Sequence, residues 1–334
     1  MATTEERLAA LEAKMAQLTA TTPTTYYTHQ YSGEEIDAAV GRAITGGALD
    51  TSVTNVSNQL GTFVRPNLLD NWYFGRPVNQ RGQTSYSTDW IYTIDRWQVS
   101  QNTTLTVNNG SVSSNGDYWF EPLEEIVDAL RGRTVTISLL FASGELEFAT
   151  GVVPATWGVW DNIALSGHVV LKGIGEDSKR LWFMVNDIAE NILAAKLELG
   201  PTQTLAHREG DKWVLNEIPD YGEQLRRCQR YAIKIGKDTA GDSSLVGFAL
   251  CTSSTLASAF ISLPVSMRTK PSVTFKNVYL SLGSSVVAVT NIAVYENTQN
   301  GIYCALSVSG GLTVGQTVAI RISDGGYIMP SADL

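Results

Sequence analysis

The feature that most constrains the fold is an aromatic-rich stretch, RPNLLDNWYFGRPVNQRGQTSYSTDWIYTIDRW, which runs from Arg65 to Trp97. Its Asn, Gly and Pro residues favour turns, and its aromatic side chains can bury a large apolar area at strand edges. Two later segments, 194–204 and 222–233, are its expected partners, because a long run of strand-like sequence lies between. We therefore expect these segments to bracket one closed β-rich unit.

Short apolar runs separated by turn signals follow this stretch. The Asn-Gly pairs at 109–110 and 115–116 are typical of tight hairpins. One helix is expected between Glu121-Pro122 and Gly132, since Pro suits a first helical turn and Gly a helix end. Many short strands with a single helix predict a β-sandwich. The expected strands are 93–107, 111–120, 134–141, 145–149, 168–172 and 181–185.

The composition changes after Gly236 to Ser, Thr, Val and Gly with little charge. Turn signals such as Asn300-Gly301 and Gly310-Gly311 again separate short apolar runs. This pattern predicts a second β-domain over 236–334, either a compact sandwich or one chain's share of a trimeric knob. Its expected strands are 245–250, 256–263, 272–280, 285–294, 302–308 and 317–323.

The N-terminus has the pattern of a short coiled coil over residues 1–22. Thr3 and Glu6 can form a capping box at its start, and Pro23 ends it. Two heptads are too short to be stable alone, because helix nucleation is costly. The alternative is one amphipathic helix that lies on a globular core of its own chain. Apolar residues with a/d spacing are Leu8, Leu11, Met15 and Leu18.

Residues 23–62 are expected to form an extended linker and two short helical segments. A second capping box at 32–35 precedes the first segment, and Gly46-Gly47 ends it. Because nothing local can bury such narrow stripes, we expect several copies of the chain to pack around one axis, and a dimer is not excluded. The apolar stripes consist of Ile36, Val40 and Ile44, and of Leu49, Val53, Val56 and Leu60.

Charge and cysteine content narrow the class of protein. The net charge is −9, with no cluster of Lys or Arg, which does not favour a nucleic-acid partner. The three cysteines, Cys228, Cys251 and Cys304, have neither disulfide nor metal-site spacing. The N-terminus carries charge where a signal peptide would be apolar, and no run reaches the ~18 apolar residues of a membrane span. We expect a protein made in a reducing cytoplasm, without membrane insertion.

No catalytic or cofactor motif stands out. The histidines are His29, His168 and His207, and none lies in a nucleophile or metal-ligand pattern. Glu145 and Glu147 fall on the same side of an expected strand, as a glycosidase pair could, but two charged residues on the solvent face of a strand are the ordinary explanation. The sequence therefore predicts a protein that is not an enzyme and binds no metal or cofactor.

Two segments could recognise sugars, which need an aromatic face and amide or carboxylate groups. The first is the loop 152–162, and the second is the segment from Tyr86 to Trp90. The structural alternative is that the tryptophans close the end of the sandwich, and Asp117, Tyr118 and Trp119 are expected in the core. The candidate carbohydrate-binding residues are Trp157, Trp160, Asp161, Asn162, Tyr86 and Trp90.

Five motifs in a fixed order resemble the receptor-binding fibre proteins of tailed bacteriophages and prophages. They are NLLDNWYFGRPVNQRGQ at 67–83, YTIDRW at 92–97, KLELG at 196–200, RCQRY at 227–231 and LPVSMRTKPSVTF at 263–275. The resemblance covers about residues 63–334. Ala232 departs from it, because an aromatic residue more often follows RCQRY in that family.

The resemblance implies a mainly β, homotrimeric fibre assembled in the host cytoplasm and carried on the virion. An N-terminal coiled coil (1–22) and linker (23–62) would precede a jelly-roll sandwich similar to carbohydrate-binding modules (63–235) and a C-terminal β-domain (236–334). The N-terminus would dock on the tail or capsid, and the β-domains would bind a host glycan or envelope protein by avidity. The alternatives are a head-fibre or baseplate assembly protein without a host ligand, and a virion glycan-degrading enzyme.

Overall fold

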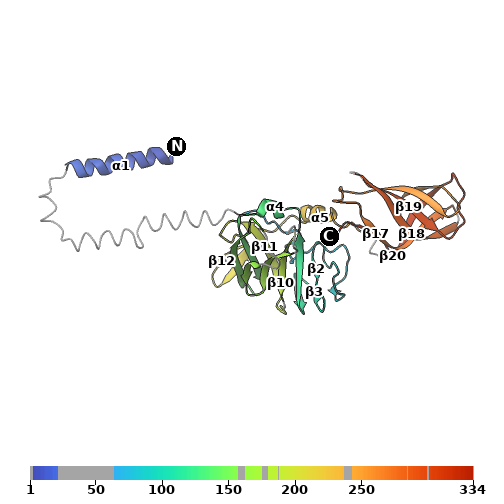
Figure 1. Cartoon of the computed structure of the whole chain (residues 1–334), viewed down its shortest axis with the longest axis horizontal. Helices are drawn as coiled ribbons and strands as arrows, with labels where there is room; N and C mark the ends of the chain where they lie inside the picture. The colour runs from blue at the N-terminus through green and yellow to red at the C-terminus, as the bar shows by residue number, and fades with distance from the viewer. Residues whose placement is uncertain are drawn as a thin grey trace. The chain divides into compact units, whose positions relative to one another are not determined.

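A computed structural model (Figure 1) describes residues 3–21, 64–156, 162–174, 180–186, 188–236, 243–283, 285–298 and 301–333. The chain divides into two compact units, Met1–Phe63 and Val64–Leu334. The second unit is mainly β, as the sequence predicts, and holds two separate apolar cores.

Helix α1 (Thr4–Thr21) confirms the predicted N-terminal helix. Its capping box is present, because the Thr3 N–H donates to Glu6 Oε2 at 2.7 Å and the Glu6 N–H to Thr3 Oγ1 at 3.3 Å. Leu8 and Leu11, two residues of the predicted a/d stripe, are 58% and 60% exposed, so their side chains face solvent. Met15 and Leu18 belong to α1, but their side chains are not described, and the coiled coil stays a prediction. The other predicted seam residues, Ile36, Val40, Leu49, Val53, Val56 and Leu60, lie outside the described residues.

The first β-domain is built from two antiparallel sheets, which confirms the predicted sandwich. The six-stranded sheet has the order β1-β3-β4-β11-β6-β7, and the five-stranded sheet has the order β2-β5-β10-β9-β8. Strand bounds are β1 Ser85–Tyr86, β2 Gln98–Val99, β3 Thr104–Asn108, β4 Ser111–Asn115, β5 Tyr118–Leu123, β6 Thr134–Phe141, β7 Leu146–Val152, β8 Asn162–Ser166, β9 Val169–Ile174, β10 Arg180–Asn186 and β11 Ile192–Leu199.

The aromatic-rich stretch supplies much of this core. Phe74 and Trp97 are fully buried, with ring centroids 5.2 Å apart, and the Trp119 centroid lies 4.5 Å from that of Trp97. The Trp97 indole N–H donates to the carbonyls of Asp70 and Asn71, at 3.3 and 3.2 Å. Burial of such large rings is the main source of stability for the domain.

The strand order differs from the jelly roll that the resemblance implies. Strands β8, β9 and β10 are hairpin neighbours with β5 beside β10, which is a Greek-key order common in sandwiches. Strands β6 and β7 are also a hairpin within one sheet, whereas a jelly roll carries most consecutive strands across the sandwich. The sandwich is thus confirmed, and the jelly-roll order is not.

The helix expected over 121–132 is mostly absent. Glu121 and Pro122 belong to strand β5, and α4 spans only Val127–Leu130. Glu121 is drawn into the sheet because its buried side chain pairs with Arg96. Pairing across the sheet thus overrides the local helix signal.

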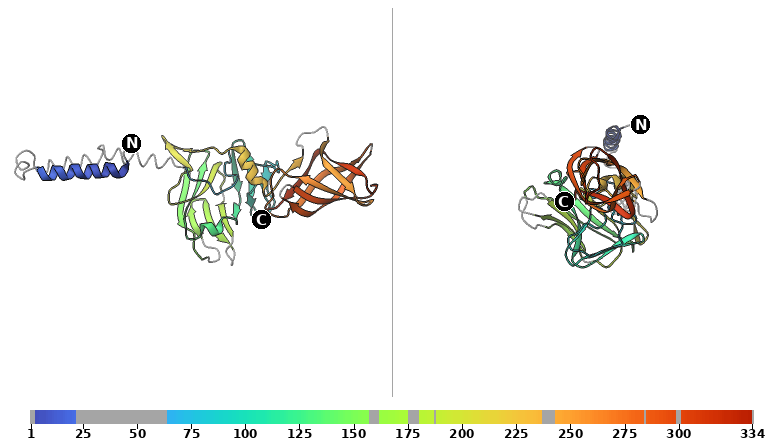
Figure 2. Two further views of the ribbon diagram at one scale, coloured as in Figure 1. Left: turned by 90° about the horizontal axis from the view of Figure 1, so that it is seen from above. Right: turned by 90° about the vertical axis from the view of Figure 1, so that its right-hand side faces the viewer.

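The second β-domain is one sheet that closes on itself, instead of the two sheets of the expected sandwich (Figure 2). The order is β14-β20-β15-β16-β19-β18-β17, and β17 also pairs with β20. The length of β20 allows it to pair with β15 on one side and β17 on the other, so the sheet has no open edge between them. Bounds are β14 Ile235–Gly236, β15 Ser244–Cys251, β16 Leu256–Ser262, β17 Ser272–Leu282, β18 Ser285–Thr298, β19 Gly301–Val308 and β20 Thr317–Ser331.

Helix α5 (Tyr221–Gln229) and the hairpin of β12 (Ala206–Glu209) and β13 (Lys212–Leu215) lie in the chain between the sandwich and the barrel. The side chain of Asp220 caps α5 by accepting the Glu223 N–H at 2.8 Å. Cys228 at the end of α5 is buried, as are Cys251 and Cys304, so all three thiols lie in the interior.

Candidate functional site

Aromatic side chains gather on the face of the five-stranded sheet that points away from the main core. Side chains alternate between the two faces of a strand. Trp119 of β5 and Phe183 of β10 therefore point into the main core, and their direct neighbours on each strand point to the opposite face. This second cluster is separate from the main core, and we call it the aromatic platform. It consists of Trp90, Tyr118, Phe120 and Trp182, packed against Val170 and Met184.

The rings of the aromatic platform contact one another closely. Phe120 and Trp182 stack with centroids 4.1 Å apart and an interplanar angle of 20°. Trp90 meets Tyr118, Phe120 and Trp182 at 6.3, 6.3 and 6.4 Å. Phe120 is buried beneath its neighbours, whereas Tyr118 and Trp182 are half-buried and Trp90 is 45% exposed. The platform is therefore held rigid from within and offers ring surface to solvent.

Trp90 occupies an unusual backbone conformation. Its φ is +55°, a region that bulky residues avoid. Its carbonyl accepts a hydrogen bond from Gln98 Nε2 at 2.8 Å, which helps to hold this conformation. Strained residues of this kind concentrate at ligand sites and cost about 1–3 kcal/mol each.

Polar side chains border the aromatic platform. Lys172 lies opposite Trp182 in the sheet register, and Asn162 lies opposite Lys172. Asn186 lies opposite Tyr118 at the other end of β10. Amide and ammonium groups beside aromatic faces are what a sugar ring requires, because its C–H face stacks on a ring and its hydroxyls need hydrogen-bond partners.

The structure places the six sequence-predicted site residues differently. Trp90 is part of the aromatic platform, and Asn162 is exposed at the start of β8 in the same sheet. Tyr86 is only 2% exposed, and its hydroxyl donates to Asn79 Oδ1 at 2.5 Å, so it lies apart from the exposed rings of the platform. Burial raises the pKa of the Tyr86 phenol to about 12. Trp157, Trp160 and Asp161 lie outside the described residues.

Sequence reasoning missed two members of the platform and misplaced a third. Phe120 and Trp182 were not singled out, and Tyr118 was expected in the core. The alternation of Tyr118, Trp119 and Phe120 was the available signal, because adjacent strand residues face opposite sides. It could not say which side was the core, since both carry aromatic rings.

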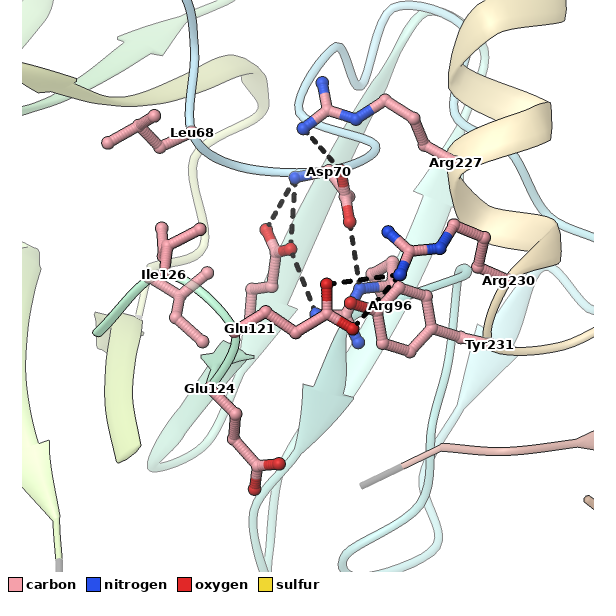
Figure 3. A pocket seen from close by; sticks show the side chains of 11 residues that line it. Leu68, Asp70, Arg96, Glu121, Glu124, Ile126, Arg227, Arg230 and Tyr231 are labelled. Carbon is pink, nitrogen blue, oxygen red and sulfur yellow. Dashed lines mark hydrogen bonds and ion pairs between the residues drawn. The ribbon is translucent and has the colours of Figure 1, made fainter. Parts of the chain in front are cut away.

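A second cluster, which we call the charged joint, lies where α5 meets the sandwich (Figure 3). Arg96 is at its centre, with Nε 3.2 Å from Asp70 Oδ2 and Nη2 3.6 Å from Glu121 Oε1. The Arg96 guanidinium also lies 3.5 Å above the Tyr231 ring. Arg227 of α5 reaches Asp70 Oδ1 at 2.6 Å. These side chains line a cavity of about 170 Å³.

Burial dominates the electrostatics of the charged joint. It raises the pKa of Glu121 well above its ordinary value, although Arg96 acts in the opposite direction. Both Glu121 oxygens accept the Asp70 backbone N–H, at 3.0 and 3.1 Å. The Nη1 atom of Arg96 has no hydrogen-bond partner among the described residues. The joint thus contains paired charges whose removal one at a time would be costly.

The same region connects the sandwich to the barrel. Arg81 bridges Asp95 of the sandwich, at 3.3 Å, and Asp333 after the last barrel strand, at 2.6 Å. Arg268 lies 3.3 Å from Glu124 Oε2. The Ile233 N–H donates to the carbonyl of Pro330 at 3.0 Å. The motif residues that carry the fibre resemblance therefore build a structural connection, which the sequence alone did not reveal.

Two carboxylates, those of Asp70 and Glu121, lie close together in the charged joint, as the side chains of a catalytic pair would. The Glu121 side chain is 1% accessible and is held by Arg96, while Asp70 is held by two arginines. Two histidine–carboxylate contacts, His168–Glu147 at 3.0 Å and His207–Glu209 at 2.9 Å, lie on the surface. Across the described ranges, no three His, Cys, Asp or Glu side chains gather in a way that could hold a metal ion.

Comparison with known proteins gives no family. The chain matches no protein-family model, no curated protein and no solved structure. A search of the described helices found none that is long and apolar enough to cross a bilayer.

Proposed function

We propose that this chain is a virion fibre protein that attaches a tailed bacteriophage to its host by non-catalytic binding of a surface glycan. The aromatic platform is the observation that carries the proposal, because it joins rigid exposed rings to neighbouring amide and ammonium groups. The order of the five motifs supports the fibre assignment. Association of copies, as a homotrimer docked on the tail or capsid through its N-terminus, belongs to the same proposal.

Binding would work by stacking and avidity. A sugar ring lies against Trp90 and Trp182, and its hydroxyl groups take hydrogen bonds from the bordering Asn162 and Lys172. A shallow site of this kind is weak on its own. Several copies on one virion convert weak single contacts into firm attachment, because each further contact forms at a high effective concentration.

The test is binding of the purified full chain to a panel of immobilised bacterial capsule, lipopolysaccharide and wall polysaccharides. Trp182→Ala and Trp90→Ala should each weaken binding about fivefold, since a lost stacking contact is worth about 1 kcal/mol. Phe148→Ala is the matched control, because Phe148 is a 48% exposed aromatic residue on β7 of the other sheet.

The double variant Trp157→Ala with Trp160→Ala tests the other candidate site, the predicted loop 152–162. Binding that is lost only in this variant, with both platform variants unaffected, would assign recognition to the loop and contradict the platform. Absence of binding to every polysaccharide of a susceptible host would contradict glycan adhesion itself.

A head-fibre or baseplate assembly role is the second candidate. The observation in its favour is that the motif residues build the charged joint and its links to the barrel, which is a structural use. Staining of susceptible host cells by labelled full chain separates the two. Staining that Trp182→Ala reduces supports adhesion, and absence of staining supports assembly.

A virion glycan-degrading enzyme is the remaining candidate. The buried Glu121, whose pKa is raised by burial, next to Asp70 is the arrangement that could favour it. Incubation with host capsule or cell wall, followed by measurement of released sugar, is the test. Release that Glu121→Gln abolishes while the fold is retained would establish the enzyme and contradict non-catalytic binding.

A further inference from the structure

A cavity of about 400 Å³ lies between the sandwich and the barrel, which belong to one compact unit. Its size falls within the range of about 300–1,000 Å³ that is typical of small-molecule sites, and such sites often lie where two domains meet. Residues of both domains line it, and we call it the junction cavity. Its polar and aromatic lining side chains include Arg81, Gln83 and Tyr92 from the sandwich, Lys234 before β14, and Thr274 and Tyr327 from the barrel.

Hydrogen bonds and an ion pair hold the two walls of the junction cavity together. The Gln80 side chain donates from Nε2 to the Ala232 carbonyl at 2.7 Å and accepts the Lys234 N–H through Oε1 at 3.1 Å. Arg81 of the sandwich reaches Asp333, which follows β20, at 2.6 Å. The two walls therefore keep one relative position, which lowers the entropic cost of binding a ligand between them.

Two cations line the junction cavity, and none of the described residues that line it is acidic. The Arg81 guanidinium donates to Asp95 and Asp333, whose side chains are 1% and 11% accessible and do not line the cavity. A guanidinium has further N–H donors beyond those that these bonds use. The Lys234 ammonium lies beside Gly82, 3.6 Å from the position that a Cβ on this glycine would take. A ligand in the cavity would thus meet the two cations and neither carboxylate.

Each wall of the junction cavity also contributes an aromatic ring. Tyr92 comes from the sandwich and Tyr327 from β20, and both are half-buried. The Arg81 guanidinium lies 5.6 Å from the centre of the Tyr92 ring. Tyr86, which the sequence singled out as a candidate sugar-binding residue, lines the cavity as well. Such rings can contact the C–H face of a sugar.

Gln83 and Thr274 add uncharged polar groups, one on each wall of the junction cavity. Both residues are exposed. An amide and a hydroxyl can each donate and accept hydrogen bonds. These two side chains therefore suit the several hydroxyl groups of a sugar ring.

The lining of the junction cavity as a whole fits a sugar ring that carries a carboxylate. A carboxylate accepts strong, charge-assisted hydrogen bonds from Arg and Lys, while the ring that carries it can lie against tyrosine. A neutral sugar would bring no counter-charge to the two cations. A bare anion such as phosphate would make no use of the tyrosine rings.

We propose that the junction cavity is a second binding site, which takes a sugar residue that carries a carboxylate, such as a hexuronic acid. The site is separate from the aromatic platform, because none of the described platform residues lines it. It rests on the proposed glycan adhesion only for the source of the sugar, an acidic residue of a host glycan.

The test is a titration of the full chain with free hexuronic acids of the gluco, galacto and manno configurations, followed by saturation-transfer NMR of the sugar signals. Each acid is compared with its neutral hexose. At least one hexuronic acid should bind at about millimolar concentration and about tenfold more tightly than its neutral hexose, because only the acid pairs with the two cations. Acetate and inorganic phosphate are titrated as well, to detect a site that takes any anion.

Two variants test the charge and the space of the junction cavity separately. Lys234→Gln removes one cation but keeps the backbone N–H that bonds to Gln80, and it should weaken acid binding about tenfold. Thr274→Phe fills the cavity from an exposed position on β17 and should abolish binding. Lys212→Gln is the matched control, because it removes the same charge at an exposed position on β13 that does not line the cavity. Circular dichroism checks that each variant is folded.

Absence of binding by every hexuronic acid, equal binding of acid and neutral hexose, or undiminished binding in either folded variant would overturn the proposal. Acetate or phosphate that binds as tightly as the best hexuronic acid would also overturn it, because the sugar ring would then contribute nothing. Trp182→Ala should leave hexuronic acid binding unchanged while it weakens polysaccharide binding at the platform, so the two proposals can fail separately.

Discussion

At the scale of single residues, Trp90 combines two properties that seldom occur together, a positive φ and an exposed indole ring. The left-handed region costs a side chain about 1–2 kcal/mol relative to glycine. Neighbouring rings and the Gln98 hydrogen bond hold Trp90 there. This conformation lowers the stability of the fold, so stability alone does not explain a tryptophan at this position.

This conformation predicts that Trp90→Gly is more stable than Trp90→Ala by about 1 kcal/mol, because only glycine adopts φ +55° without strain. Both variants lose the indole and should lose glycan binding equally. Urea unfolding of the two variants is the measurement. An alanine variant as stable as the glycine variant would contradict the assigned backbone conformation.

Asp95 predicts a pH dependence of stability. Burial raises its pKa from 3.8 to about 6, although Arg81 acts in the opposite direction. Because the folded state holds this proton more tightly, stability should fall as pH rises from about 4 through 6, by roughly 3 kcal/mol in total. Glu121 contributes in the same direction, since its pKa is also raised.

Urea unfolding of the wild type and of Asp95→Asn between pH 4 and pH 7.5 measures this effect. The variant should lose the part of the slope that lies between about pH 4 and pH 6. A wild type whose unfolding free energy rises steadily over this range would contradict the buried, poorly solvated Asp95 carboxylate.

At the scale of elements, the sequence predicted which strands exist better than it predicted where each strand or helix begins and ends. Most of the expected strands overlap strands of the structure, but the helix expected over 121–132 is replaced by the end of β5 and the short α4. The reason is tertiary, because Glu121 is held by Arg96, a partner 25 residues earlier in the chain. No local pattern encodes that contact.

The order of the strands in the sheets could not be predicted from the sequence either. The barrel closes through β20, whose two ends pair with different strands, and the resemblance to a jelly roll did not extend to the order of β6 to β10. The candidate site shows the same limit. Trp90 was predicted from its surroundings in sequence, but Trp182 joins it only because β10 lies beside β5.

The cap of α5 gives a prediction at this scale. Asp220→Ala should lower the free energy of unfolding by about 1 kcal/mol, because the Glu223 N–H then loses its acceptor. Asp220→Asn retains an accepting oxygen and should cost less. Chemical denaturation of both variants checks the difference, and equal losses would contradict the cap.

At the scale of the whole β-unit, the ion pairs of Arg81 tie the sandwich to the barrel and should be worth more than an exposed ion pair within the sandwich. Arg81→Ala leaves Asp95 buried without its cation and should cost about 3 kcal/mol or more. Arg131→Ala removes an exposed pair with Asp128 and should cost less than about 0.5 kcal/mol. Thermal unfolding that ranks the two variants in the reverse order would contradict the role of Arg81.

The function proposed for the whole molecule depends on one surface, the outer face of the five-stranded sheet. The sequence contains eight tryptophans, of which Trp97 and Trp119 are fully buried in the main core and Trp90 and Trp182 form part of the platform. A ligand on this face must alter the surroundings of the platform indoles and leave the core indoles unchanged.

Fluorine NMR of the full chain labelled with 5-fluorotryptophan, titrated with a surface polysaccharide from a susceptible host, tests this claim most directly. Single Trp→Phe substitutions assign each signal. The account predicts that the signals of Trp90 and Trp182 shift or broaden while those of Trp97 and Trp119 stay fixed. A titration in which the polysaccharide binds but the Trp90 and Trp182 signals do not change would contradict it.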